Sequence, residues 1–97
     1  MAQYIVLGNW TDQGIREANQ TVARSEKFRE IAREAGATVH ALFWTQGRYD
    51  VVARVEAPDD ETMAIISLRL GAAGSVRGET LRAFSAEEMA GILAKLG

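Results

Sequence analysis

The stretch VHALFWTQGRYDVVARV, residues 39–55, is the most informative part of this 97-residue chain. Two apolar runs rich in β-branched and aromatic residues flank a short polar segment, which is typical of a β-hairpin. Gly47 lies in that segment, and glycine adopts the positive φ that a tight hairpin often needs. Tyr49 and Asp50 follow at the start of the second strand and are expected on its opposite faces. The stretch predicts an antiparallel pair of strands and indicates no particular reaction.

Before the hairpin, the pattern predicts a strand and a broken helix. The run QYIVLGNW, residues 3–10, is apolar and β-branched, and Thr11 follows as a helix-start residue. The helical region 12–35 then changes the phase of its apolar stripe. We therefore expect a break near residues 23–25, with Arg24 at the bend, and a helix end at Gly36.

After the hairpin, the pattern predicts a helix, a strand and a last helix. Acidic residues directly after Pro58 suit the positive end of a helix dipole, and this helix is expected to stop at Gly71 or Gly74. Residues 75–84 resemble a fourth strand. The segment Ser85-Ala86-Glu87-Glu88 is a capping box, which predicts a further helix at the C-terminus.

The predicted order is β-α-β-β-α-β with a broken first helix and an extra C-terminal helix. This is the ferredoxin-like α+β arrangement, an antiparallel four-stranded sheet with helices on one face. A chain of 97 residues has room for one such core, so we expect a single domain over residues 1–97.

The face of the sheet without helices indicates whether the chain acts alone. Strand alternation is expected to place several apolar side chains there, namely Leu42, Trp44, Val52, Phe84 and one or more of Tyr4, Val6 and Trp10. A contiguous patch of that size seldom stays in water. The simplest cover is a second copy of the chain, so we predict a homodimer or a larger homo-oligomer.

Composition excludes several classes of function. A net charge of −2, from eleven basic and thirteen acidic residues, argues against a bulk nucleic-acid binder. No cysteine is present, which excludes disulfides and thiolate chemistry, and a single histidine excludes a multi-histidine metal centre within one subunit. No apolar run approaches the ~18 residues of a membrane span. We expect a cytoplasmic protein with no cofactor, no bound metal and no membrane partner.

The segment Gly47-Arg48-Tyr49-Asp50-Val51-Val52 resembles the G-x-Y-D signature of the GYD domain family. The resemblance continues through residues 56–61 and 78–84 and is nearly full-length. It implies a small bacterial or archaeal protein of the dimeric α+β barrel class. That class includes cofactor-independent monooxygenases, isomerases, haem proteins and ligand binders. A shared fold does not assign any of these activities to this chain.

Two residues are candidates for catalysis. His40 is the only side chain whose ordinary pKa lies near neutrality, which suits a general base or a haem ligand. Asp50, beside Tyr49, could bind or deprotonate a small substrate. The alternatives are structural: His40 hydrogen-bonded within an interface, Asp50 capping hairpin amides, and Tyr49 packed below the helices.

Other residues are candidates for ligand binding. Arg24 and Arg82 could hold an anion, and Trp10 and Trp44 could form the wall of an aromatic pocket or anchor an interface. Together with Tyr49 they predict a small aromatic or anionic ligand, bound between sheet and helices or between subunits. Two alternatives stay open. One is a cofactor-independent oxygenase or isomerase, and the other is an assembly protein without small-molecule chemistry.

Overall fold

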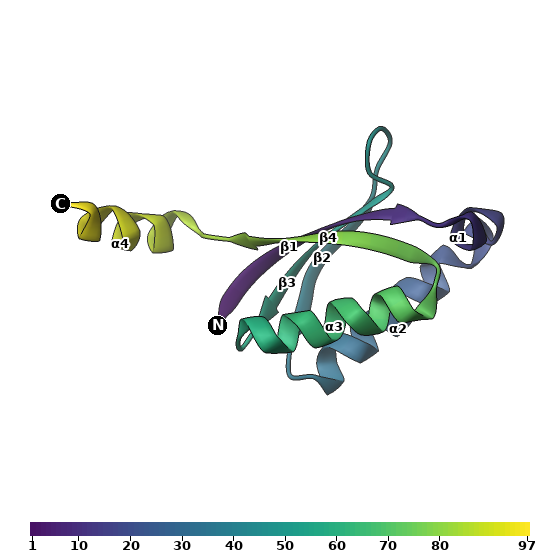
Figure 1. The fold of residues 1–97 in the computed structure, drawn as a ribbon, viewed down its shortest axis with the longest axis horizontal. Helices are drawn as coiled ribbons and strands as arrows, with labels where there is room; N and C mark the ends of the chain where they lie inside the picture. The colour runs from purple at the N-terminus through teal and green to yellow at the C-terminus, as the bar shows by residue number, and fades with distance from the viewer.

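The computed structural model describes residues 1–97 and contains one four-stranded antiparallel sheet (Figure 1). The strands are β1 (Ala2–Trp10), β2 (Thr38–Trp44), β3 (Val51–Ala57) and β4 (Val76–Ala83). They lie in the order β2-β3-β1-β4, with every neighbouring pair antiparallel. The predicted ferredoxin-like α+β fold is therefore confirmed.

The helices are α1 (Asp12–Arg16), a 3₁₀ turn η1 (Ala18–Gln20), α2 (Thr21–Glu34), α3 (Asp60–Ala73) and α4 (Ala86–Leu96). Figure 1 shows α2 and α3 on one side of the sheet and α4 projecting beyond the end of β4. Side chains cap three of the helices: Thr11, Asp59 and Ser85 accept hydrogen bonds from backbone N–H groups in the first turns of α1, α3 and α4. None of the helices is long and apolar enough to cross a membrane.

The core lies between the sheet and the two covering helices. Helix α2 contributes Phe28 and Ala32, and α3 contributes Met63 and Ile66. The strands complete the core with Tyr4, Val6, Val39, Ala53, Val55 and Ala57. At about 25 cal/mol per Å² of buried apolar surface, such contacts supply the main stabilisation of a domain this small.

The break in the first helical region lies earlier than the sequence pattern predicts. Helix α1 ends at Glu17, whose φ of −110° and ψ of 34° leave helical geometry, and the 3₁₀ turn follows. The predicted break at residues 23–25 is wrong, because α2 runs through these residues without interruption. The prediction assumed that the apolar residues before position 23 form a buried face, and they do not. Ile15 is 52% exposed and Val22 is 61% exposed.

The faces of β2 also differ from the prediction. A register shift between Val39 and Ala41 inserts His40 as an extra residue, so the alternation of side chains changes sides there. Leu42 pairs with the buried Ala53 and faces the helices, whereas Phe43 pairs with Val52 on the open face. Leu42 and Trp44 were expected on the open face and lie on the helix side.

The faces of β4 also differ from the expected alternation, which placed Leu81 and Ala83 toward the core and Thr80, Arg82 and Phe84 on the open face. Arg82 pairs with the buried Tyr4, and Thr80 pairs with the buried Val6. Both therefore lie on the helix side, and Leu81 lies on the open face opposite Ile5. Tyr4 and Val6 themselves belong to the core, so their expected place on the open face is wrong.

An apolar open face exists nonetheless, with different members. It consists of Ile5, Leu7, Ala41, Phe43, Val52 and Leu81, which cross-strand pairing brings onto one side of the sheet. Phe43 is 65% exposed and Leu81 is 42% exposed. We call these six residues the open face.

Candidate ligand pocket

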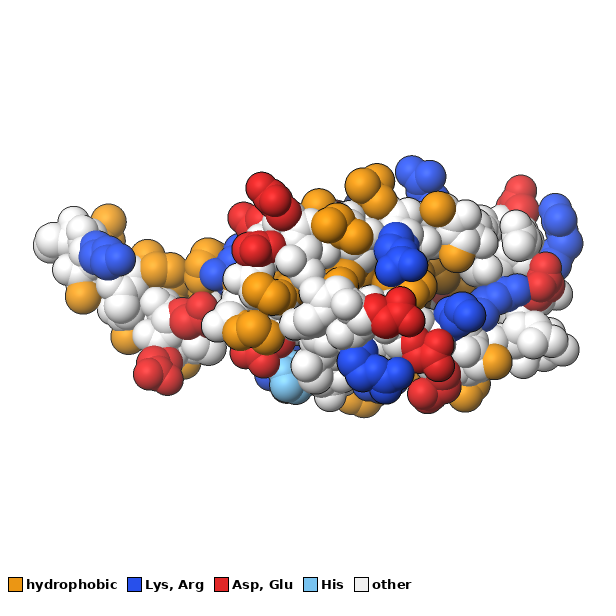
Figure 2. Space-filling model, turned by 90° about the horizontal axis from the view of Figure 1, so that it is seen from below, with side chains coloured by type: hydrophobic (Ala, Val, Ile, Leu, Met, Phe, Trp, Pro, Cys, Tyr) orange, Lys and Arg blue, Asp and Glu red, His pale blue; other side chains and the backbone are white.

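A pocket of about 250 Å³ lies between the sheet and the helices, and 11 of its 17 lining residues are hydrophobic. The sheet forms the floor, with Val6, Leu42, Val51, Ala53 and Val76. Helices α2 and α3 form the opposite wall, with Phe28, Ile31, Leu70 and Ala73. Figure 2 views this side of the molecule and shows apolar side chains recessed between charged ones. The interior thus suits an apolar group.

Polar side chains are concentrated at one side of the pocket, along the first turns of α2. Thr21, Arg24, Ser25 and Lys27 all line it. Thr21, Arg24 and Ser25 share a helix face because they are spaced by three and four residues. The indole N–H of Trp44 donates to the Thr21 hydroxyl over 2.9 Å, which ties the end of β2 to the start of α2.

The charge of this lining is positive. Arg24 forms an ion pair with Glu17 and also donates to the Glu17 carbonyl, so it connects the end of α1 to α2. Lys27 lines the pocket without an ion-pair partner within 4.0 Å. No aspartate, glutamate or histidine is among the lining residues. A ligand with a negatively charged end would match this rim.

Helix α1 closes one end of the pocket by packing directly on backbone. Gly14 lies so close to the Ser75 carbonyl that a Cβ there would meet this oxygen at 1.9 Å. Thr11 donates through its N–H to Ser75 over 3.1 Å and through its hydroxyl to Gly74 over 2.6 Å. Gln13, next to Gly14, and Ser75 both line the pocket.

Three of the residues expected to bind ligand lie in this pocket. Trp10, Arg24 and Trp44 line it, contributed by β1, α2 and β2. Their convergence depends on the bulge in β2, which turns Trp44 toward the helices.

The two candidate catalytic residues are not brought together. His40 forms a 2.9 Å contact with the Glu56 carboxylate near the start of β2. Asp50 lies at the other end of the hairpin, where its carboxylate accepts from the backbone N–H of Trp10 over 3.0 Å. The Asp50 backbone also donates to Gly8. Asp50 therefore joins the hairpin to β1.

Tyr49 does not pack below the helices. Residues 45–50 lie outside both strands, so the alternation of β3 does not extend back to Tyr49. Its hydroxyl donates to Glu79 over 3.3 Å, and Glu79 is opposite Leu7 of the open face. Tyr49 is outside the pocket lining.

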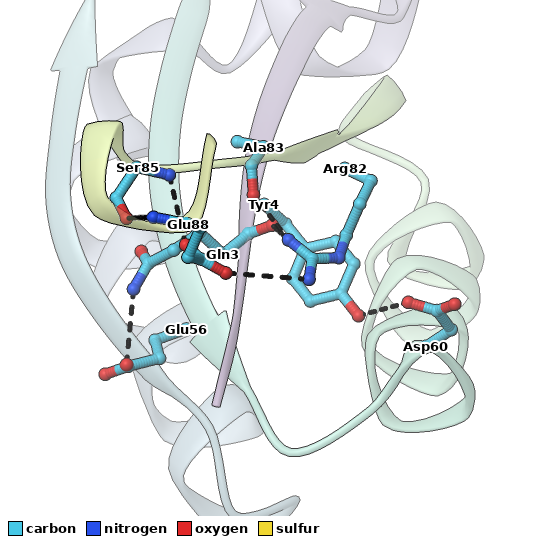
Figure 3. A network of polar contacts seen from close by, with 8 residues as sticks. All are labelled: Gln3, Tyr4, Glu56, Asp60, Arg82, Ala83, Ser85 and Glu88. Carbon is cyan, nitrogen blue, oxygen red and sulfur yellow. Dashed lines mark hydrogen bonds and ion pairs between the residues drawn. The ribbon is translucent and has the colours of Figure 1, made fainter. Parts of the chain in front are cut away.

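Arg82 belongs to a separate polar network at the far end of the sheet (Figure 3). Its guanidinium lies 5.6 Å from the Tyr4 ring centre and 4.5 Å from that of Phe84, and it donates to the Gln3 and Ala83 carbonyls. Tyr4 donates to the Asp60 carboxylate. Burial, together with this hydrogen bond and the Asp60 charge, raises the pKa of Tyr4 to about 12. Arg82 therefore lies outside the pocket, and its contacts connect β1 with the end of β4.

Several pocket residues were not among the predicted binding residues. Phe28, Ile31 and Leu70 line the pocket, and sequence does not reveal this because a side chain that lines a cavity has the same apolar periodicity as one that fills a core. The signal in the sequence is the face of α2 that runs from Thr21 and Arg24 to Phe28 and Ile31, polar at one end and apolar at the other. No group of three or more histidine, cysteine or acidic side chains is arranged to hold a metal ion.

Comparison with known proteins identifies the family. The model of the GYD domain matches residues 4–93. The chain belongs to the GYD domain family. A relative from Thermus thermophilus, named glutamine synthetase and cystathionine beta-lyase binding protein, is 36% identical over 90 residues, which cover 92% of this chain and 95% of the relative.

A solved structure supports the fold. The crystal structure of TTHA0845, also from Thermus thermophilus, superposes with a TM-score of 0.59 and 28% identity, covering 89% of this chain and 96% of that one. The GYD domain thus spans nearly all of the architecture seen here, from β1 into α4.

Proposed function

We propose that this GYD domain protein is a binding protein that holds a small, largely apolar ligand with an anionic group. The observation that supports this most is the pocket between the sheet and α2. It combines an apolar interior with Arg24 and Lys27 and with no acidic side chain in its lining. A buried apolar pocket with a few convergent polar groups is the usual form of a small-molecule site.

The size of the pocket limits the ligand. A dry cavity of ~150 Å³ holds benzene, and drug-sized ligands occupy ~300 Å³ or more. A volume of about 250 Å³ therefore suits either a fused two-ring aromatic group or an acyl chain of medium length, each with a short charged end. The unpaired Lys27 is the natural partner for that end, because Arg24 already pairs with Glu17.

Binding is favoured over proton abstraction by the chemistry of the lining. It contains no carboxylate, imidazole or phenol that could act as a general base. His40 and Asp50, on which the oxygenase or isomerase alternative depends, lie at opposite ends of the hairpin and outside the pocket.

The proposal includes self-association. Phe43 and Leu81 expose large apolar surfaces on the open face, which would be covered by a second copy. This is the dimeric state implied by the α+β barrel class, and sedimentation of the purified chain at micromolar concentration tests it. A single monomeric species would contradict it.

The ligand proposal is tested with two matched pairs of probes. Decanoate is compared with decanol, and indole-3-acetate with tryptophol, by isothermal titration calorimetry. We expect saturable binding and at least about tenfold tighter binding of each carboxylate, which corresponds to ~1.4 kcal/mol. Lys27→Met should remove most of that preference and leave the alcohols unaffected.

A filled pocket provides the control. Ala53 is 4% exposed on the floor, and Ala53→Leu places three more carbons in the cavity. The variant should unfold at a temperature equal to or above that of the parent and bind every probe more weakly. Equal binding by Ala53→Leu, or no saturable binding by the parent, would reject the pocket as the site.

A second candidate function is suggested by the relative named for binding glutamine synthetase and cystathionine beta-lyase. Ile65 and Leu68 on the outer side of α3 are 53% and 73% exposed and offer an apolar contact for another protein. Biolayer interferometry with each purified enzyme tests this function directly. The candidate requires binding that Leu68→Glu weakens at least tenfold, and it fails if neither enzyme binds.

A further inference from the structure

A second, smaller cavity lies next to the pocket, between α3 and the edge strand β4. It has a volume of about 30 Å³, and Met63 and Ile66 of α3 line it. Both of these residues belong to the buried core. Figure 1 shows α3 on the same side of the sheet as α2, so the pocket and this cavity lie within one apolar layer. We call the smaller space the end chamber.

Three side chains lie between the pocket and the end chamber. Val6 of β1, Phe28 of α2 and Leu70 of α3 line both spaces. Val6 and Phe28 are buried, and Leu70 packs against the core. A boundary formed by three separate side chains can open by rotamer changes, which occur even in well-packed cores. The two spaces can therefore join without any movement of the sheet.

The lining of the end chamber suits hydrocarbon and nothing charged. No charged residue lines it, and its two hydroxyls, from Ser67 and Thr80, are hydrogen-bonded to each other over 3.1 Å. Gly78 leaves room in its floor. A Cβ at this position would have its nearest neighbours at 3.6 Å, which is ordinary van der Waals contact. The chamber is thus an apolar recess with its polar groups already satisfied.

The charged rim, the pocket and the end chamber follow one another in space. Arg24 and Lys27 lie on the first turns of α2, and Phe28 follows Arg24 by about one turn. The end chamber lies on the other side of Phe28, under α3. A ligand whose anionic group binds at Lys27 therefore extends its apolar part toward Phe28 and Leu70. A straight hydrocarbon chain can pass between these side chains, whereas a fused ring system is too wide.

We propose that the ligand is a straight-chain carboxylic acid whose terminal carbon occupies the end chamber, and that Phe28 and Leu70 set the longest chain that binds. The inference rests on the proposed function and names the class of its apolar group. A cavity of ~150 Å³ holds the six carbons of benzene, which is about 25 Å³ per carbon. On this scale the pocket of about 250 Å³ holds ~10 carbons, and the end chamber of about 30 Å³ holds ~1 more.

Isothermal titration calorimetry with saturated acids from hexanoate to tetradecanoate tests the length limit. Each buried CH₂ should tighten binding about fourfold. We expect this gain to continue up to undecanoate and then to stop. Decanoate should also bind more tightly than indole-3-acetate. A gain that continues to tetradecanoate, or tighter binding of indole-3-acetate than of decanoate, would overturn the proposal.

Two variants should move the limit in opposite directions. Gly78→Ala fills the end chamber with one carbon, so undecanoate should lose its advantage of about fourfold over decanoate. Leu70→Ala removes three carbons from the boundary and joins the two spaces, so the gain should continue to about tetradecanoate. Leu68→Ala removes the same three carbons from an outer position of α3 that is 73% exposed, and it should leave the length profile unchanged.

The outcomes separate the length limit from the proposed function. If the parent chain binds no acid saturably, the pocket itself is rejected as the site. If acids bind but the longest accepted chain is the same in the parent, Gly78→Ala and Leu70→Ala, the pocket stands and the role of the end chamber is rejected. If Leu70→Ala does not fold, Gly78→Ala decides alone, because alanine stabilises a strand interior relative to glycine.

Discussion

Replacement of Gly14 by alanine tests how the end of the pocket is built. The added Cβ would lie 1.9 Å from the Ser75 carbonyl oxygen and 2.9 Å from its carbon. Both atoms are backbone, so no side-chain rotation relieves the contact. Helix α1 must move away from residues 74 and 75, and the two hydrogen bonds from Thr11 to this turn are lost.

The size of the effect follows from these contacts. Two hydrogen bonds at a net ~1 kcal/mol each contribute about 2 kcal/mol. Alanine regains up to ~1 kcal/mol through its better helix propensity. We expect Gly14→Ala to lower the free energy of unfolding by about 1 to 2 kcal/mol, since repacking of α1 adds to the loss. For a domain of this size that is a fall in melting temperature of roughly 5–15 °C.

Thermal unfolding followed by circular dichroism measures this, with Gly71→Ala as the control. Gly71 is also helical, but a Cβ there meets nothing within 4 Å. The control should therefore be stabilised by up to ~1 kcal/mol. If both variants shift in the same direction, the close packing of α1 on Ser75 does not describe the protein.

Three further predictions concern other contacts. The hydrogen bond from the Ser85 N–H, aided by the charge of Arg82, holds the pKa of Glu88 below its ordinary 4.5. The capping of α4 by Glu88 is therefore complete above about pH 4.5 and is lost as the pH falls through the lowered pKa. A carboxyl NMR titration should place the inflection of Glu88 below pH 4.5. The pKa of Tyr4 is raised to about 12, so the contribution of Tyr4 to stability is complete below pH 10 and is lost as the pH rises toward 12. The Tyr49→Phe variant retains Tyr4 as its only tyrosine, and its ultraviolet titration should show no ionisation near pH 10. Gly47 has a φ of 104° with open space around it, so Gly47→Ala should lower the free energy of unfolding by about 1 to 2 kcal/mol through backbone strain alone, and an unchanged urea midpoint would contradict this.

The order of the elements could be predicted from the sequence because local signals decide it. Gly47 does adopt positive φ in the hairpin, Gly74 ends α3 with φ of 87°, and Ser85 with Glu88 starts α4. Each of these depends on residues within a few positions of one another. Together with the apolar periods they are sufficient for the ferredoxin-like arrangement.

The faces of the strands could not be predicted in the same way. One extra residue at His40 reverses every later side chain of β2, and nothing in the local sequence marks the bulge. Arg82 of β4 was expected on the open face of the sheet, whereas its guanidinium lies over the Tyr4 ring on the helix side. Arginine combines an apolar stem with a charged end, so polarity alone does not place it.

Only some of the residues proposed from the sequence as a site lie together in the structure. Trp10, Arg24 and Trp44 were each expected to bind ligand, and all three line the pocket. His40, Asp50, Tyr49 and Arg82 lie elsewhere because their positions depend on tertiary contacts with Glu56, the Trp10 backbone, Glu79 and Tyr4. Such long-range contacts leave no periodic pattern in the sequence.

The most direct test of the ligand pocket uses the two tryptophans of the chain. Trp10 and Trp44 both line the pocket, and their indole N–H groups give two separate signals in a nitrogen-15 correlation spectrum. Titration with decanoate should shift both signals saturably, with a larger change at Trp44 because its N–H is bonded to Thr21. If both indole signals stay in place, or if only amides of α4 shift, the pocket between the sheet and α2 is not a ligand site.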